Sequence, residues 1–167
     1  SFLSPLYSEE AQRSFELLGK IGEEEQKARK AADAVSKKLR EQGFPPMFTG
    51  VGEAPFDIIG DYFRGTLATL TDQIERMDEL AEACERMADI QIESWQYFRN
   101  TELTVKRVYF PLHKGMDGFM SGEQYRKIYW EPLKKCIMAL INMGVTPIIY
   151  TEGKYNTRLE YLAEVPK

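Results

Sequence analysis

Three short apolar runs, each followed by a helical pattern, constrain the fold of this 167-residue chain more than any other feature. The runs cover residues 47–51, 105–112 and 145–150, and their content of Val, Ile, Phe and Tyr is typical of buried strands. Because each connection is long enough for a crossover helix, neighbouring strands are expected to run parallel. The sequence therefore predicts an α/β fold with about three parallel strands and long helices.

Apolar residues recur every three or four positions in two stretches, as they do on the buried face of a helix. From residue 73 to 100 the repeat comprises Ile74, Met77, Leu80, Cys84, Met87 or Ala88, Trp95 and Phe98. The second helix, capped at Ser121 and stopping near Gly144, repeats Tyr125, Ile128, Tyr129, Leu133, Cys136, Ile137 and Leu140. Both cysteines fall in step with these faces, which favours buried free thiols over a disulfide or a metal site.

The first 42 residues are predicted to be a helical lead-in that starts at the cap Ser8, with acids in its first turn. One face carries Phe15, Leu18, Ala28, Ala32, Val35 and Leu39. Gly19, Gly22 and the acidic run 23–25 indicate a break and a solvated middle. We expect one domain over 1–167, with the lead-in at 1–42 and three βα units at 43–167.

Composition excludes several classes of function. The net charge of −4 gives no broad positive field, so nucleic acid is not an expected partner. No apolar run approaches the ~20 residues that span a bilayer, and the first residues lack the order of a signal peptide. A soluble, cytoplasmic protein without a membrane partner is the expectation.

Three strands cannot close a barrel or cover both faces of a parallel sheet, so the sheet edges would stay open. The first residue is Ser1, and Lys167 directly follows Pro166, which indicates that both ends are cut. Missing sequence or an obligate partner, such as a second copy in a homo-oligomer, is therefore implied.

Ligands of parallel α/β folds bind in the loops that follow the strands. Here these loops hold Glu53, Phe56 and Asp57; then His113, Lys114 and Asp117; then Tyr150, Glu152, Lys154, Tyr155, Asn156 and Arg158. His113, the only histidine, could bind a metal or move a proton near neutral pH, or simply bond to a backbone carbonyl. Glu152 needs a task or a partner, for which Lys154 and Arg158 are the ordinary choices.

Two further features allow a functional and a structural interpretation. Gly115, Gly118 and Gly153 could bring backbone N–H groups to an anion, but turn glycines are the favoured interpretation. Asp61 and Arg64 are three residues apart and could form an intrahelical ion pair. Alternatively, Arg64 could bind a substrate carboxylate with its forked donors.

Three segments resemble consecutive signatures of the uroporphyrinogen decarboxylase superfamily in their order and spacing: residues 54–65, 113–121 and 147–153. The resemblance extends over about 43–167 and implies a (β/α)₈ barrel (TIM barrel). This chain would be its central portion, and the remaining barrel strands or a homo-oligomer partner would complete it. The resemblance implies either decarboxylation of porphyrinogen acetates without a cofactor or cobalamin-linked methyl transfer with zinc. Asp57 and Asp61 replace a threonine and a tyrosine of the decarboxylases, and Tyr150-Thr151-Glu152-Gly153 replaces the His-x-Cys-Gly zinc motif of the methyltransferases.

The resemblance favours a methyltransferase-like enzyme that moves a methyl group between a small methylated substrate and a corrinoid or thiol acceptor, with a corrinoid protein as a partner. The residues expected to be catalytic are His113, Glu152 and Asp57, with His113 and Glu152 as ligands if a divalent metal such as zinc binds. Those expected to bind substrate or cofactor are Phe56, Asp61, Arg64, Lys114, Asp117, Tyr150, Lys154 and Asn156. The alternatives are a tetrapyrrole-carboxylate decarboxylase that needs no cofactor, and a non-catalytic fragment or binding module.

Overall fold

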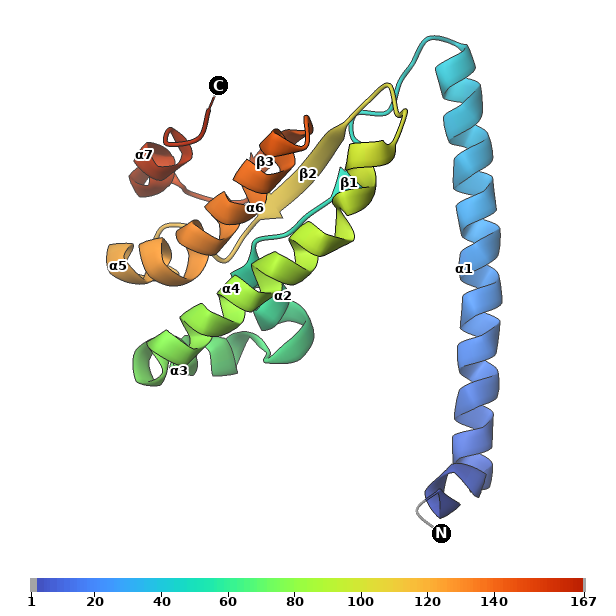
Figure 1. The fold of residues 1–167 in the computed structure, drawn as a ribbon. Helices are drawn as coiled ribbons and strands as arrows, with labels where there is room; N and C mark the ends of the chain where they lie inside the picture. The colour runs from blue at the N-terminus through green and yellow to red at the C-terminus, as the bar shows by residue number, and fades with distance from the viewer. Residues whose placement is uncertain (1–2, 167) are drawn as a thin grey trace. The chain divides into compact units, whose positions relative to one another are not determined.

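The computed structural model describes residues 3–166 and divides into two compact units, one up to Pro46 and one from Met47 (Figure 1). The first unit consists of a 3₁₀ turn, η1 (Ser4–Tyr7), and one long helix, α1 (Glu9–Glu41). The second unit contains all three strands of the structure's described part. The division lies four residues after the predicted end of the helical lead-in.

Helix α1 begins where the sequence predicts. The Ser8 side chain accepts a hydrogen bond from the backbone N–H of Ala11 at 3.2 Å, and acids occupy the first turn. The break predicted around Gly19 and Gly22 is wrong, because α1 is continuous over 33 residues. A helical glycine costs only about 1 kcal/mol, and the surrounding Glu, Lys, Leu and Ala residues are good helix formers.

The second unit is built on a parallel sheet in the order β1-β2-β3, which confirms the predicted α/β class. Its strands are β1 (Gly50–Val51), β2 (Arg107–Leu112) and β3 (Thr146–Thr151). The first strand is shorter than the apolar run 47–51 that predicts it. Thr49 continues the pairing irregularly, since its N–H donates to the carbonyl of Arg107 and its hydroxyl to that of Val105.

The connections are helical, as predicted. Between β1 and β2 lie α2 (Pro55–Ile58), the π-helical segment η2 (Ile59–Phe63), α3 (Thr66–Glu75), α4 (Met77–Ser94) and η3 (Gln96–Asn100). Between β2 and β3 lie α5 (Gly122–Gln124), the π-helical η4 (Tyr125–Trp130) and α6 (Glu131–Asn142), and after β3 come η5 (Asn156–Arg158) and α7 (Leu159–Leu162).

The single helix predicted over residues 73–100 is in fact divided. Arg76 leaves the helical conformation at φ −142° and ψ 42°, so α3 ends and α4 begins there. Ile74, predicted to be buried, is 82% exposed, because α3 instead buries the face that carries Thr69, Asp72 and Gln73. The rest of the repeat packs as expected, with Leu80, Cys84 and Trp95 buried.

The core of the second unit lies between the sheet and the helices α4 and α6, which run side by side in Figure 1. Val108, Phe110 and Leu112 alternate toward these helices and are fully buried. Every residue of the repeat predicted for the second helix is fully buried as well. Both cysteines are buried free thiols, which confirms that prediction.

The other face of the sheet carries an aromatic row. Tyr109 stacks on Phe48 with ring centroids 5.1 Å apart and on Tyr150 at 6.0 Å. Tyr150 is 52% exposed, and Val51, which pairs with Tyr109 on the adjacent strand, is 54% exposed. Large apolar side chains therefore remain open to solvent on this side.

Within residues 3–166, no helix is long and apolar enough to cross a membrane.

Candidate active site

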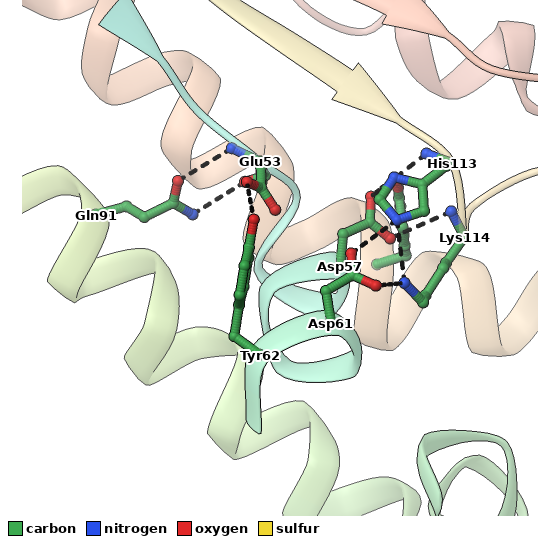
Figure 2. A network of polar contacts seen from close by, with 8 residues as sticks. Glu53, Asp57, Asp61, Tyr62, Gln91, His113 and Lys114 are labelled. Carbon is green, nitrogen blue, oxygen red and sulfur yellow. Dashed lines mark hydrogen bonds and ion pairs between the residues drawn. The ribbon is translucent and has the colours of Figure 1, made fainter. Parts of the chain in front are cut away.

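The loops after β1 and β2 bring four ionisable residues together (Figure 2): Asp57 and Asp61 on one side, and His113 and Lys114 on the other. Pro55 occupies the first turn of α2, where its fixed φ favours a helix start directly after the strand. Asp57 and Asp61 are four residues apart and so lie on the same side of this helical segment. His113 and Lys114 directly follow β2. Adjacent parallel strands thus deliver both pairs to the same edge of the sheet.

Asp57 is the buried member of the cluster, with no exposed surface. Its Oδ2 accepts a hydrogen bond from the Tyr129 hydroxyl at 2.7 Å, and its Oδ1 accepts one from the backbone N–H of Lys114 at 3.2 Å. Burial raises the pKa of Asp57 from 3.8 to about 6, although the positive charge of His113 and the bond from Tyr129 act in the opposite direction. This carboxyl group therefore titrates near neutral pH.

Asp61 and His113 form the accessible part of the cluster, and the buried Lys114 contacts both of them. The Nε2 of His113 lies 2.8 Å from Oδ2 of Asp61 and 3.0 Å from Nζ of Lys114, which also donates to Oδ1 of Asp61. Partial burial favours a higher pKa for Asp61, but the hydrogen bonds from Lys114 and His113 outweigh it and lower that pKa below 3.8. The side chains of His113 and Asp61 are 34% and 32% exposed, so a small molecule can reach them.

This arrangement is suited to moving a proton. When Nε2 of His113 carries a proton it can donate to Asp61, and when it lacks one it can accept from Lys114. Its Nδ1 lies 3.6 Å from Oδ2 of Asp57, so a carboxylate faces each ring nitrogen. Asp61 can therefore accept a hydrogen bond from Nε2, and Asp57 places an opposite charge close to Nδ1, which together orient the ring for proton transfer.

Tyr129 contacts the buried side of the cluster through its hydrogen bond to Asp57. The sequence did not predict it as a site residue. Burial raises the pKa of its phenol well above 10, so the group stays protonated and donates to Asp57. A Cβ on Gly115 would lie only 2.5 Å from the Tyr129 ring, which explains the glycine as a close backbone approach. Gly118 and Gly153 have positive φ values of 87° and 105°, as the turn interpretation predicts. The sequence signal for Tyr129 was a hydroxyl on an otherwise apolar helix face, where a buried phenol needs a partner.

A second polar group holds the loop after β1 in place (Figure 2). The side-chain amide of Gln91 accepts from the backbone N–H of Glu53 at 3.2 Å and donates to its carbonyl at 3.0 Å. The Tyr62 hydroxyl donates to the Glu53 carboxylate at 3.0 Å. Gln91 was assigned no role from the sequence, yet it fixes the backbone that leads into Asp57.

Asp117 ties the loop after β2 to the loop after β3. Its backbone N–H donates to the carbonyl of Lys154 at 2.7 Å, and its carboxylate accepts from the hydroxyl and N–H of Thr157 at 2.6 and 3.3 Å. The Arg158 guanidinium lies 3.8 Å from the same carboxylate. These contacts occupy Asp117 within the fold, so it positions the loop next to the site.

The remaining predicted residues are placed apart from the cluster. Phe56 is fully buried against Phe119 and Tyr129, so its place is the core rather than a binding surface. Arg64 does not pair with Asp61, as one interpretation predicted; it makes two hydrogen bonds to Asp72, at 2.7 and 3.0 Å, because Asp61 is turned toward Lys114.

The predicted site residues of the loop after β3 are exposed and make no hydrogen bond or ion pair with the cluster in the described part of the chain. Glu152, Lys154 and Asn156 are exposed, and Tyr150 belongs to the open aromatic face. In the described part of the chain, the Glu152 carboxylate has no hydrogen bond or ion pair, and His113 contacts Asp57, Asp61 and Lys114 instead of it. Neither Lys154 nor Arg158 pairs with Glu152, since the Arg158 guanidinium donates to the Met120 carbonyl.

The residues present fit a metal poorly. Among residues 3–166, no group of three or more His, Cys, Asp or Glu side chains is placed to hold an ion. Burial raises the pKa of Cys84 and of Cys136 to about 12, so neither offers a thiolate. The Lys114 ammonium lies beside Nε2 of His113, where it would repel a cation. The cluster as folded therefore favours proton transfer over metal binding.

Comparison of the chain with protein-family models, with curated proteins and with solved structures finds no match. The fold and the site define an α/β protein with a parallel three-stranded sheet and an acid–base cluster at the carboxyl ends of two strands.

Proposed function

We propose that the cluster of Asp57, Asp61, His113 and Lys114 is the proton-transfer centre of an enzyme, and that the enzyme is a methyltransferase-like member of the uroporphyrinogen decarboxylase superfamily. One observation carries the first part: an accessible imidazole lies between two carboxylates at the carboxyl edge of a parallel sheet. The resemblance of three sequence segments carries the second part.

The aromatic face of the sheet supports a (β/α)₈ barrel around this centre. Parallel sheets are normally covered on both faces, and Phe48, Tyr109 and Tyr150 form an uncovered row. In a barrel this row would face the interior, next to the catalytic ends of the strands. Flat aromatic surfaces also suit a macrocycle, which is common to corrinoids and tetrapyrroles.

The role of the chain's own residues follows from the geometry. During transfer from a methylated substrate, the bond between methyl carbon and leaving atom breaks, its electrons stay on the leaving atom, and the proton on Nε2 of His113 moves there. Asp61 orients the ring, and Lys114 can return a proton to Nε2. A corrinoid, when bound, supplies the methyl acceptor. Toward a thiol acceptor, the same ring nitrogen accepts the thiol proton.

The alternative activity is decarboxylation of a tetrapyrrole carboxylate, and the exposed edge of Asp61 favours it. A partly exposed carboxylate can face a protonated pyrrole, while His113 and Lys114 offer a proton to the carbon that loses carbon dioxide. Both activities thus need the same proton donor. They differ in the macrocycle that binds.

The test uses the full-length protein with two probes, hydroxocobalamin and a porphyrinogen that carries acetate groups. We expect corrinoid binding in an absorbance titration and methyl transfer from methylcobalamin to a thiol. His113→Gln should lower turnover by roughly 10²-fold or more, as loss of a general acid or base does. Asp61→Asn should also lower it. Asp78→Asn, which removes an exposed aspartate that pairs with Lys127, is the matched control and should leave turnover unchanged.

The outcomes separate the candidates. Porphyrinogen binding with release of carbon dioxide supports the decarboxylase instead. If neither probe binds, the superfamily assignment is wrong. If turnover occurs but is equal in wild type and His113→Gln, the cluster is not the reaction centre, and a non-catalytic role for these residues follows.

A further inference from the structure

Helix α1 carries an apolar row that nothing within its own unit covers. None of its 33 residues is buried, although Leu18, Ile21 and Val35 are large and apolar and are 62%, 53% and 58% exposed. The row repeats at alternating spacings of three and four residues. We call it the seam; it comprises Ser14, Leu18, Ile21, Glu25, Ala28, Ala32, Val35 and Leu39. This heptad spacing is the pattern of a helix that pairs with another helix.

The helix has little else to stabilise it. Its ion pairs, Arg13 with Glu9, Lys27 with Glu24 and Lys37 with Glu41, all lie between exposed side chains. Such pairs contribute little, because solvent screens them and ordering the side chains costs entropy. Most helices in proteins depend on packing of an apolar face. A helix of this length therefore indicates a partner along the seam.

Charge identifies the partner. Residues 9–25 contain six acids and two bases, which gives a net charge of −4, whereas residues 26–42 contain six bases and two acids, a net charge of +4. A parallel second copy would place like charges side by side over the whole length. An antiparallel second copy places the acidic half of each helix along the basic half of the other. We propose that α1 pairs through the seam with α1 of a second copy of this chain, in antiparallel orientation.

The change in charge also sets the register. The sign changes at Gln26, between Glu25 and Lys27, so the two-fold axis should lie close to this residue. The nearest alignment that keeps seam against seam matches residues whose numbers add to 53. It pairs Leu18 with Val35, Ile21 with Ala32, Ser14 with Leu39 and Glu25 with Ala28 of the second copy.

This alignment is consistent with packing. Ile21 opposite Ala32 and Leu39 opposite Ser14 combine a large with a small side chain, which lets the helices approach closely. Glu25 is the only charged residue of the seam. In this register it lies next to Arg29 of the second copy, which can satisfy its carboxylate.

The first experiment measures the mass of the full-length protein by sedimentation equilibrium. Ala32→Glu places a charge in the seam, whereas Ala34→Glu makes the same change about 200° further around the helix, on the opposite side. Both residues are exposed in the described chain, so neither change disturbs a core. Wild type and Ala34→Glu should be dimers. Ala32→Glu should raise the dissociation constant at least about tenfold, since the unpaired charge enters the interface twice.

The second experiment fixes the orientation with engineered cysteines. Positions 21 and 32 are about 16 Å apart along the helix, and a disulfide needs Cα atoms within about 7 Å. Ile21→Cys protein should therefore crosslink with Ala32→Cys protein and not with itself. The natural Cys84 and Cys136 are buried and do not interfere. A monomeric wild type, equal effects of the two glutamates, or self-linking of each cysteine variant would overturn the proposal.

Discussion

Replacement of Asp57 by asparagine should remove a specific dependence of stability on pH. The buried carboxyl group has a pKa of about 6 in the folded protein, against 3.8 as the ordinary value in an unfolded chain. Between these values the folded state binds more protons than the unfolded state. The free energy of unfolding therefore falls as the pH rises through this range.

The magnitude follows from the two pKa values. At about 1.4 kcal/mol per pKa unit, ionised Asp57 lowers stability by about 3 kcal/mol once the pH is well above 6. About 2 kcal/mol of this develops between pH 4 and pH 7. Asparagine cannot ionise, so Asp57→Asn lacks this loss. Its amide keeps the bond from Tyr129 but turns an N–H toward the backbone N–H of Lys114, at a cost of about 1–3 kcal/mol that does not depend on pH.

The assay is urea unfolding of wild type and Asp57→Asn from pH 4 to pH 7. The difference in free energy of unfolding should shift in favour of the variant by about 2 kcal/mol across this range. Asp78→Asn should show the opposite trend, because Lys127 lowers the pKa of Asp78 and ionised Asp78 is stabilising. In a His113→Gln background the dependence should move to higher pH, since the charge of His113 lowers the pKa of Asp57. If the difference in free energy of unfolding between wild type and Asp57→Asn does not change with pH, the conclusion that Asp57 titrates in this range is wrong.

Two further changes test the support of the site. Gly115→Ala should destabilise the protein by about 1–3 kcal/mol in chemical unfolding, because the added Cβ would lie 2.5 Å from the Tyr129 ring. Gly122→Ala is the control and should not destabilise it, because its Cβ would meet no atom closer than 3.8 Å. Ser121→Ala should cost about 1 kcal/mol in the same measurement, since it removes the capping box that Ser121 forms with Gln124; an unchanged midpoint would show that this helix start does not need the cap.

The fold was largely readable from the sequence because its signals are local and repeated. The helix that contains Tyr125 to Leu140 shows an apolar repeat that is buried throughout, and the apolar run 105–112 predicts β2. The errors fall where a tertiary contact or a single backbone conformation overrides the pattern. Arg76 adopts a non-helical conformation that its own sequence does not indicate, and only two residues of the run 47–51 pair as a regular strand.

The positions of the candidate site residues were predictable only in part. The rule that parallel strands deliver ligand-binding loops to one edge selected Asp57, His113 and Lys114, and the structure brings these residues together. The same rule selected Phe56 and Glu152, which lie in the core and on the surface. Sequence position gives the loop but not the direction of the side chain. Direction depends on which donors the neighbouring elements provide.

The π-helical segments show how those donors are provided. Asp61 lies in η2 and Tyr129 in η4, and both segments replace the ordinary helical turn next to the cluster. A π turn shifts the following side chains around the helix axis relative to a regular α-helix, and such turns are frequent at functional sites. Periodicity placed Tyr129 correctly on the buried face, but regular spacing predicts an α-helix at both places, so the π turns themselves could not be predicted from it. The departure from regular geometry at both segments therefore supports the proposal that Asp57, Asp61 and His113 belong to a functional site.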